Sequence, residues 1–569
     1  MTTLPQVTSD VDVHSKLLTD YAALDLLAEE WEALWKDDPH AEIFQNPYWL
    51  RAVWKSCSDQ ITPFTPAVYR GSKLIGVLPL AQRGKELHFI GEPLSDYNDV
   101  LCREEDTAEV LSVAFAELLK ARERWSTCIL DNVPAESHLM RHLPDLPEDV
   151  RKQLRTAFRC PCSTVLMGAD ELVANELIRK QSLRRHENAL RRQGQISFAH
   201  IEDRESIRSH LAVFFHHHVA RRAVLGEKSH FLDERTRRVF ETLVEELDPK
   251  SLLRFAVLYV DKQPIAFHFG FEANGKYILY QTAFSIDYAK CAPGEVLLRK
   301  LFAYARDRKL SELDMTRGGE SYKDRFCNHI RENLTIHFNH DAGICRTILL
   351  RIALAEGALR KSIERLRVHA DAYRFARNTA IRVLNFWRNE RELLGSGVLP
   401  YASGVLRRMW PRRSPRQQDT AIFEIPQSAI ASRTASAPRE FSATPATLSE
   451  LAVLSVTHQG ELPSFDQLRA RVNRAEHAYA IREGARIVQL WFVAPHNPLK
   501  ASSLQASCIS AEHCWTDASC RNSDTYLALL RLFEDAEANI TLKCPIRSPI
   551  ADTLRDVVHS PLLKHTRAA

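Results

Sequence analysis

The chain has 569 residues, of which 45% are hydrophobic and 26% are charged, and its formal net charge is +4. This length predicts several domains with sizeable cores, and the small net charge argues against nucleic acid as the main partner. Because the twelve cysteines lack disulfide-like spacing, and neither a signal-peptide pattern nor an apolar stretch of about 20 residues is visible, we expect a cytoplasmic protein.

The pattern over residues 20–165 predicts one α/β unit. Leucine and tryptophan side chains recur at helical spacing from Leu24 to Trp35, and a β-hairpin is expected around Gly71. The polar segment Ser95-Asp96-Tyr97-Asn98-Asp99 either faces a cleft or forms an Asx-type turn. The other expected elements are strands at 87–91 and 127–130 and a helix at 110–122.

The same order of elements recurs over residues 170–340. Tyr277 to Phe284 predicts a strand, a helix begins at Gly294, and Leu313 to Met315 predicts a second strand, followed by a polar turn. A Pro-Gly pair before a helix leaves backbone N–H groups at its positive end, which suits a pyrophosphate, although an ordinary helix start has the same pattern. The corresponding loop of the first unit, residues 102–106, is acidic, so we expect the cofactor at the second unit.

Two further stretches stand out, one rich in basic residues and the other in histidine. Arg179 to Arg192 predicts a strongly basic helix, which forms either a solvated face or a rim for phosphates or an acidic substrate. His216, His217 and His218 are consecutive on a predicted helix, so they point in different directions and cannot bind one metal ion together. We therefore expect no metal.

Several of these stretches together resemble a known family. They are SLRRHENALRRQGQISF from Ser182, HHVARRAVLGEKSHF from His217, PIAFHFGF from Pro264, APGEVLL from Ala292 and LDMTRGGESYKDRF from Leu313. They resemble GNAT-superfamily acetyltransferases of the CelD (cellulose biosynthesis) type, also described as BioF2-like domains, which are relatives of the FemAB transferases. The resemblance covers roughly residues 30–340, and it departs from the family at Arg222, where tryptophan is frequent. It implies a tandem GNAT-like α/β fold, with mixed sheets flanked by helices, and acetyl-CoA or another acyl-CoA as a substrate.

The expected chemistry is direct attack of an acceptor on the thioester, because no Ser-His-Asp or Cys-His arrangement is evident. Glu320 or His218 would take the acceptor's proton and Tyr322 would protonate the thiolate, although a structural salt bridge is an equal alternative for Glu320 and Arg317. The expected cofactor-binding residues are Gly294, Glu295, Val296 and Arg185, and the expected substrate-binding residues are Asp96, Tyr97, Asp314, Arg317 and Lys323.

Beyond residue 340 the resemblance ends. Residues 345–410 predict a basic helical arm, since 351–413 hold fourteen Lys or Arg against five Asp or Glu. This arm either packs on the catalytic domain or, as the second choice, contacts the inner face of a membrane. Residues 411–450 predict a flexible linker, and 451–569 predict another α/β domain, a degenerate GNAT-like one by its element order, with helices at 524–538 and 550–558.

The predicted function is therefore transfer of an acyl group from acyl-CoA to an amine or hydroxyl group. The resemblance implies that the acceptor is a sugar or a cell-envelope or exopolysaccharide precursor. A FemAB-like transferase that uses aminoacyl-tRNA and a non-catalytic scaffold in polysaccharide biosynthesis are the alternatives.

Overall fold

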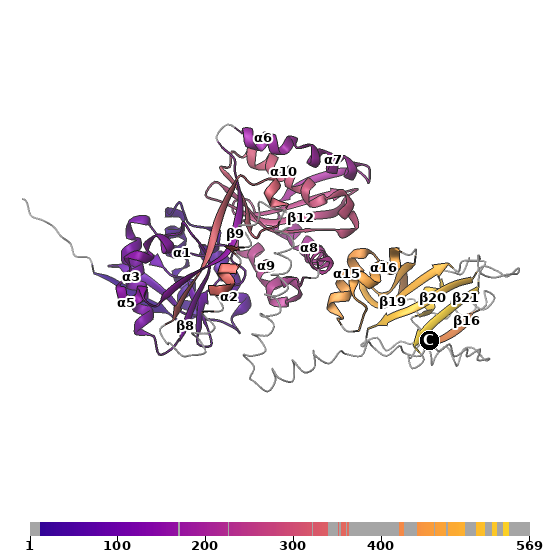
Figure 1. Cartoon of the computed structure of the whole chain (residues 1–569), viewed down its shortest axis with the longest axis horizontal. Helices are drawn as coiled ribbons and strands as arrows, with labels where there is room; N and C mark the ends of the chain where they lie inside the picture. Colours follow the sequence, from indigo (N-terminus) through magenta and orange to yellow (C-terminus); the bar gives the residue numbers. More distant parts are fainter. Residues whose placement is uncertain are drawn as a thin grey trace, which may run out of the picture. The chain divides into compact units, whose positions relative to one another are not determined.

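The structure is a computed structural model, and its described residues fall into two compact units (Figure 1). The first unit contains residues 12–215, 233–284 and the described residues from 288 to 362; the second contains 216–232, 285–287 and the described residues from 420 onward. The described residues are 12–168, 171–225, 227–320, 322–339, 351, 354–359, 361–362, 420–425, 441–459, 461–473, 476–495, 508–517, 526–531 and 539–545.

The N-terminal part of the first unit is a small sheet with amphipathic helices. The predicted helix around Leu24–Trp35 is confirmed as α1 (Tyr21–Asp37), which begins where the Asp20 side chain accepts the N–H of Ala23. Leu24, Leu27, Trp31, Leu34 and Trp35 all lie on its buried face. The predicted hairpin is confirmed as β3 and β4, which turn at Gly71 with φ +63°. The sheet has the order β1 (Val13–Leu18), β3 (Thr65–Arg70), β4 (Lys73–Val77), β7 (Leu101–Cys102), and helices α2 (Pro47–Cys57), α3 (Thr107–Lys120), α4 (His138–His142) and α5 (Glu148–Arg151) belong to the same part of the chain.

An eleven-stranded mixed sheet runs through both halves of the first unit. β9 pairs with β14 on one side and with β15 on the other, and β15 in turn pairs with β8. Strand β15, from the end of the second predicted α/β unit, therefore lies between two strands of the first. The order is β10 (Ile196–Ile201), β11 (Leu253–Val260), β12 (Gln263–Ala273), β13 (Lys276–Phe284), β14 (Glu312–Arg317), β9 (Leu154–Leu166), β15 (His329–Asn339), β8 (Thr127–Pro134), β6 (Glu86–Phe89), β5 (Leu80–Arg83), β2 (Thr62–Pro63).

Helices cover this sheet around β12 and β13. In Figure 1, α6, α7 and α10 lie on one side of β12, and α9 lies on the other. Helix α10 (Pro293–Asp307) buries its Val296, Leu297, Leu301 and Phe302 side chains in a core shared with α6, α7 and the sheet. Helix α9 (Glu234–Glu246) packs against α2, where Glu246 accepts from Lys55 at 2.8 Å.

The basic helix expected at 179–192 is confirmed as α7 (Gln181–Arg191). A separate helix, α6 (Leu172–Arg179), ends directly before it, and Lys180 between them is not helical. The break lets both helices bury leucines against α10: Leu177 from α6, and Leu183 and Leu190 from α7.

The second unit contains a six-stranded sheet and part of α8 (Arg204–Val224), whose residues from 216 onward belong here. Its core joins Ala220 of α8 to Leu451, Leu468 and Trp515. The sheet has the order β16 (Thr420–Ile425), β21 (Asn539–Pro545), β20 (Cys508–Thr516), β19 (Arg486–Pro495), β18 (His477–Glu483), β17 (Phe441–Pro445), and the helices of this part are α15 (Leu448–Thr457), α16 (Phe465–Asn473) and α17 (Tyr526–Arg531).

The C-terminal predictions differ in one respect from the structure. Strands β16 and β17 lie inside the stretch 411–450 that the composition predicted to be a flexible linker. The β-branched and aromatic residues of TAIFEI outweigh the surrounding Pro, Ser and Ala content. Most of the predicted arm at 345–410, much of the helix at 524–538 and the helix at 550–558 lie outside the described residues. Overall, the predicted mixed α/β fold, with sheets flanked by helices, is confirmed.

Candidate active site

Strands β13 and β14 pair over a short distance only. Their parallel register joins Tyr277 to Leu313 and ends with Ile278 opposite Asp314. Strand β13 continues to Phe284, and β14 continues to Arg317. A gap in the regular backbone pairing therefore opens beyond Ile278 and Asp314, and at its start the Thr316 hydroxyl donates to the Leu279 carbonyl at 3.4 Å. Backbone N–H and C=O groups that face such a gap need other partners, and an extended ligand with amide groups can supply them.

Helix α10 begins after this gap. Its N-cap residue, Ala292, has φ +48° and gives no side-chain cap, and its carbonyl accepts the N–H groups of Glu295 at 3.0 Å and Val296 at 3.2 Å. These two amides, which the sequence predicted to hold the cofactor, are therefore used within the first turn. Gly294 precedes them at the positive end of the helix and faces Phe284 of β13, whose ring would lie 3.2 Å from an added Cβ.

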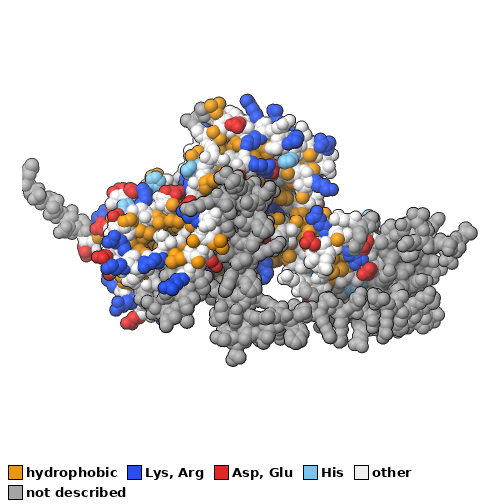
Figure 2. Space-filling view, in the orientation of Figure 1, with side chains coloured by type: hydrophobic (Ala, Val, Ile, Leu, Met, Phe, Trp, Pro, Cys, Tyr) orange, Lys and Arg blue, Asp and Glu red, His pale blue; other side chains and the backbone are white. Residues whose placement is uncertain are grey.

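The side chains around the start of α10 are charged. Glu295 pairs with His186 of α7, with 3.1 Å between Oε2 and Nδ1, and also with Arg325. Its carboxylate is therefore held by basic partners, which is a structural role. Arg185 lies on the exposed face of α7. Figure 2 shows Lys and Arg side chains gathered over this end of the first unit.

The polar segment after β6 meets the end of β14 through an ion pair. Nε of Arg317 lies 2.5 Å from Oδ1 of Asp96, and the Arg317 guanidinium also donates to the Pro93 carbonyl at 3.0 Å. Asn333 of β15 donates to the Asp96 carbonyl at 2.8 Å. Burial raises the pKa of the Asp96 carboxyl to about 6, against the opposing charges of Arg317 and Lys323. Because 31% of the Arg317 side chain is exposed, its guanidinium can still meet an anionic substrate group.

Asp314 and Tyr97 form a second contact between the same two segments. The Tyr97 hydroxyl donates to Oδ1 of Asp314 at 2.8 Å, and the N–H of Thr316 donates to the same oxygen at 2.7 Å. Both side chains are buried, and burial raises the pKa of Asp314. The nearest cation is Arg331 of β15, 3.9 Å from Oδ2. Two residues predicted to bind substrate therefore bind each other.

The turn after β14 carries Glu320, Tyr322 and Lys323. Lys323 is buried, and its Nζ lies 3.0 Å from Oε2 of Glu320 and donates to the Arg317 carbonyl at 2.9 Å. Lys323 therefore fixes the turn, a role that differs from the predicted contact with substrate. Glu320 is partly exposed, and Tyr322 packs against the core under α10. Both residues follow the carboxyl end of β14, the strand that borders the gap.

His218, the other predicted base, belongs to the second unit. It is buried, and its Nδ1 lies 2.8 Å from the Ser229 hydroxyl oxygen. Its ring packs beside those of His230 and Phe231, at 4.8 Å from each. A base in this position would have to give up a buried hydrogen bond, so we rank Glu320 before His218.

The structure also contains a polar cavity of about 680 Å³, and Tyr97, Asn98 and Asp99, from the segment that the sequence predicted either to face a cleft or to form a turn, line it. Its basic groups include Lys276, which lies 2.8 Å from Glu42, and Arg331. The remaining lining residues are His40, Gln45, Pro134, Ala135, Glu136, Ser137, His138, Arg141, His329, Ile330 and Glu332.

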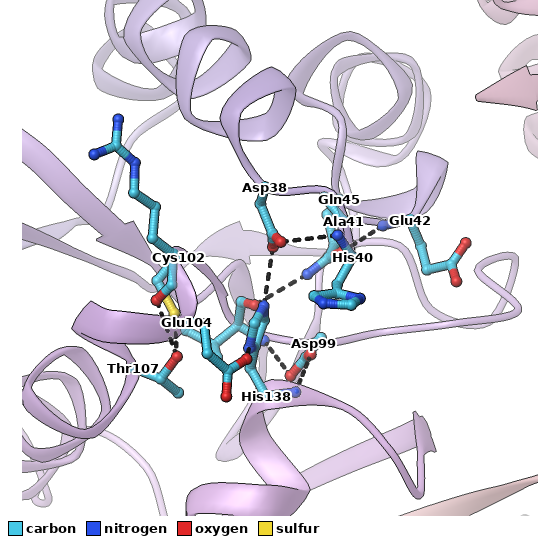
Figure 3. Close-up of polar contacts among 12 residues, drawn as sticks. Asp38, His40, Ala41, Glu42, Gln45, Asp99, Cys102, Glu104, Thr107 and His138 are labelled. Carbon is cyan, nitrogen blue, oxygen red and sulfur yellow. Dashed lines mark hydrogen bonds and ion pairs between the residues drawn. The ribbon is translucent and has the colours of Figure 1, made fainter. Parts of the chain in front are cut away.

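On one side of this cavity, the buried side chain of His138 is surrounded by carboxylates (Figure 3). Nε2 of His138 lies 3.1 Å from Oδ2 of Asp38, and Nδ1 lies 3.0 Å from Oε2 of Glu104. Asp99 accepts the backbone N–H groups of His138 and Leu139. Burial alone would lower the pKa of His138, but these carboxylates raise it. The cluster comes from four separate stretches, so no local spacing could have revealed it.

Among the described residues, no group of three or more His, Cys, Asp or Glu side chains is arranged to hold a metal ion. None of the helices in the same residues combines the length and the apolar character needed to cross a bilayer.

Comparison with known proteins gives the class of the second half of the first unit. Residues 179–324 match the profile of the acetyltransferase (GNAT) domain family. The chain therefore carries a GNAT acetyltransferase domain, and the predicted acyltransferase-like fold is confirmed at this level. This range includes the gap between β13 and β14, the start of α10 and the turn to Lys323. No curated protein matches the chain.

Solved structures resemble the chain distantly. The structure of FemX is 10% identical to this chain. The match covers 54% of this chain and 95% of the FemX chain, with a TM-score of 0.41. The C-terminal domain of a protein named as a lysylphosphatidylglycerol synthetase from Agrobacterium fabrum is 12% identical. That match covers 58% of this chain and 95% of the domain, with a TM-score of 0.39. A tandem GNAT protein from the clavulanic acid biosynthesis pathway is 11% identical. That match covers 57% of this chain and 98% of the other protein, with a TM-score of 0.33.

Proposed function

We propose that this protein transfers an acyl group, with acetyl as the first choice, from acyl-CoA to an amine or hydroxyl group of a sugar or cell-envelope precursor. The observation that carries the proposal is the gap between β13 and β14 next to the uncapped start of α10, inside residues 179–324. GNAT domains typically use acyl-CoA, whose arm contains amides and whose other end carries phosphates. An opened strand pair beside a helix N-terminus offers partners for both.

In this proposal the amide-bearing arm lies along the unpaired edge of β13. The pyrophosphate lies at Gly294, where the helix dipole and the backbone N–H favour an anion. Arg185, on the exposed face of α7, supplies a further positive charge. Glu295 and Val296 contribute to the shape of the helix start, since their amides already bond to Ala292.

The acceptor lies on the side of Asp96 and Arg317. Arg317, oriented by Asp96 and by the Pro93 carbonyl, binds an anionic part of the acceptor. Glu320 takes the proton of the attacking amine or hydroxyl, directly or through water, and Tyr322 protonates the leaving thiolate. The nucleophile then attacks the thioester carbonyl, the C–S bond breaks, and no covalent enzyme intermediate is needed.

The CelD-type resemblance supplies the acceptor class in this proposal. One of the motifs of that type, LDMTRGGESYKDRF, includes most of β14 and the turn that follows it. A sugar amine or hydroxyl linked to an anionic group would use both Glu320 and Arg317.

Calorimetric titration of acetyl-CoA and of CoA tests the cofactor. We expect binding by the parent protein and at least roughly tenfold weaker binding by Gly294→Asp, which places a carboxylate at the predicted pyrophosphate position. Leu26→Asp is the matched control, since it adds the same charge at an exposed position of α1. Circular dichroism checks both folds, because the new Cβ requires the Phe284 ring to move slightly.

Three outcomes decide the proposal. Loss of binding in Gly294→Asp alone supports the site at α10. Equal binding by all three proteins overturns that site. No binding of either ligand to the parent overturns the acyl-CoA reaction and favours transfer from aminoacyl-tRNA or a scaffold role.

A further inference from the structure

The polar cavity of about 680 Å³ lies within the first unit and has no role in the acyl transfer described so far. Its volume falls in the range of about 300–1,000 Å³ that is usual for small-ligand sites. The floor consists of buried polar residues, which are Gln45, Tyr97, Asn98, Asp99 and His138. The rim carries exposed or partly exposed side chains, which include His40, His329, Glu136 and Glu332. A ligand can therefore enter from solvent and reach a polar floor.

Hydrogen bonds to the backbone hold this floor in shape. The side-chain amide of Gln45 donates to the Val100 carbonyl at 3.1 Å, and that of Asn98 donates to the Asp131 carbonyl at 2.9 Å. The Asp99 carboxylate accepts three backbone N–H groups at 2.7–2.9 Å. Because these groups cannot turn away without breaking buried hydrogen bonds, the cavity is preformed.

The cavity has an excess of negative charge. Its lining contains four carboxylates and three permanent cations, which are Glu42, Asp99, Glu136 and Glu332 against Lys276, Arg331 and Arg141. Four further carboxylates contact these cations or His138, namely Glu312, Asp314, Asp38 and Glu104. Lys361 adds one cation, 3.0 Å from Glu332, and the excess remains even when His138 is protonated. Since an anion would be repelled, the cavity does not suit a phosphate, a nucleotide or acyl-CoA.

Hydrogen-bond donors and acceptors alternate along one wall. Nζ of Lys276 lies 2.8 Å from Oε1 of Glu42, and a terminal guanidinium nitrogen of Arg331 lies 3.9 Å from the same oxygen. Nε of Arg331 lies 3.5 Å from Oε1 of Glu136. A hydroxyl group donates and accepts, so neighbouring hydroxyls of one ligand can bond to a cation and to its carboxylate together. A cationic ligand would instead have to compete with Lys276 or Arg331 for carboxylates that they already neutralise.

Two histidines at the rim add further hydrogen-bonding groups. Among the described residues, the ring nitrogens of His40 and His329 have no hydrogen-bond or ion-pair partner. The His40 ring packs edge-on against His138, with 5.9 Å between the ring centres (Figure 3). A neutral imidazole offers one donor and one acceptor nitrogen, which again matches hydroxyl groups.

The cavity and the candidate acceptor site lie on the same face of the large sheet. Arg331 of β15 is the register partner of Cys162 of β9, and Cys162 is the register partner of Arg317 of β14. Directly opposite residues of antiparallel strands share a face, so both arginines do. Two strand spacings, about 10 Å, separate their backbones. The lining residues 97–99 also follow directly after Asp96, which pairs with Arg317.

We propose that this cavity is a subsite for a neutral sugar unit of an acceptor that extends to Arg317. Hydroxyl groups of the sugar bond to Glu42, Lys276 and the rim histidines. The acceptor is then an oligosaccharide or the end of a polysaccharide instead of a single sugar. The link to acylation rests on the proposed function, whereas sugar binding by the cavity does not.

Saturation-transfer NMR with the full-length protein tests binding. The probes are three neutral tetrasaccharides: cellotetraose, chitotetraose and mannotetraose. We expect at least one to bind, and excess CoA should not displace it. His40→Ala combined with His329→Ala, and separately Glu136→Gln, should weaken binding roughly 3- to 10-fold, the effect of about one lost hydrogen bond.

The matched controls for these variants are His14→Ala and Glu148→Gln. His14 is exposed on β1, and Glu148 is exposed and pairs with Lys152. Both controls should bind the tetrasaccharide as the parent does, and circular dichroism checks every fold.

Three binding results would overturn the proposal. The first is that the parent binds none of the neutral tetrasaccharides. The second is that both cavity variants bind as tightly as the parent, because the sugar would then lie elsewhere. The third is tighter binding of tetraglucosamine, the cationic counterpart of chitotetraose, which would assign the cavity to a cation.

Release of CoA from acetyl-CoA tests the link to acylation separately. The cavity variants should lower kcat/KM for the tetrasaccharide roughly 3- to 10-fold and leave kcat/KM for the corresponding monosaccharide within about twofold. Equal losses for the two acceptors would overturn the subsite role. Binding of the tetrasaccharide without release of CoA would support the sugar site and count against the proposed acyl transfer.

Discussion

The hydroxyl group of Tyr97 donates a 2.8 Å hydrogen bond to Oδ1 of Asp314, which lies 217 positions later in the chain. Both side chains are buried. Asp314 is the last residue of β14 that pairs with β13 before the gap opens. The contact therefore holds the polar segment after β6 against the strand that borders the candidate acyl-CoA site.

Replacement of Tyr97 by phenylalanine should destabilise the protein. The variant removes one of the two donors to Oδ1 of Asp314 and leaves only the N–H of Thr316. A hydrogen bond to a buried carboxylate contributes about 1.5–3 kcal/mol, so we expect a loss of that size in the free energy of unfolding. Urea unfolding followed by tryptophan fluorescence measures it.

Tyr280→Phe is the control for this variant. Tyr280 is also buried, but its hydroxyl donates at 2.8 Å to the neutral carbonyl of Leu94. We expect a smaller loss, of about 1 kcal/mol. Equal losses in the two variants would contradict a special contribution from the charge of Asp314.

The local elements were predictable because their signals are local. The aromatic and β-branched run of β13, the Pro-Gly start of α10 and the apolar stripe of α1 each fall within a few residues. The pairing of β15 between β9 and β8 could not be predicted, because it joins residues as far apart in the chain as Asn339 and Thr127 and no short spacing encodes it.

In the candidate site, too, the contacts between residues far apart in the chain could not be predicted from the sequence. Polar residues at strand ends marked Asp96 and Arg317, but the sequence could not show that they pair with each other. It also gave no sign of Arg331, which reaches Asp314 from a strand that was not assigned to the site. The sequence predicted that Lys323 binds substrate, yet the backbone carbonyls of Thr316 and Arg317 hold it in the interior.

The stability of the first unit should fall as the pH rises from about 6.5 to 9. The cause is His88 of β6, whose Nε2 lies 3.3 Å from Glu86 and whose Nδ1 lies 3.4 Å from Glu92. Burial alone would lower the pKa of His88, but these two carboxylates raise it to about 9. Between the two pKa values the folded state holds a proton that the unfolded state has released, so stability is lost as the pH increases.

The variant His88→Gln should lack this part of the pH dependence. We expect the parent to lose about 1–3 kcal/mol more than the variant between pH 6.5 and 9. Urea unfolding at several pH values under reducing conditions gives both curves, and His14→Gln, at an exposed position of β1, is the control. Parallel curves for the parent and His88→Gln would contradict the ion cluster around His88.

Arg317→Lys should separate acceptor binding from cofactor binding. The guanidinium holds Asp96 and the Pro93 carbonyl at once, and a lysine ammonium, which is a single compact charge on a shorter side chain, cannot reproduce that fork. We expect kcat/KM for an acceptor found by screening to fall roughly 10- to 100-fold, which is about 1.4–2.7 kcal/mol of transition-state stabilisation. The Kd of acetyl-CoA should stay within about twofold, since Gly294 and the β13 edge are untouched.

Release of CoA, measured with a thiol reagent, gives the kinetics, and calorimetry gives the Kd. Arg308→Lys, which changes the same side chain where it pairs with Glu272, is the control. A parallel loss of acetyl-CoA affinity in Arg317→Lys would assign Arg317 to the cofactor instead. Unchanged kinetics and affinity would leave the Asp96–Arg317 pair with a structural role only, and the acceptor would then have to bind elsewhere along the gap.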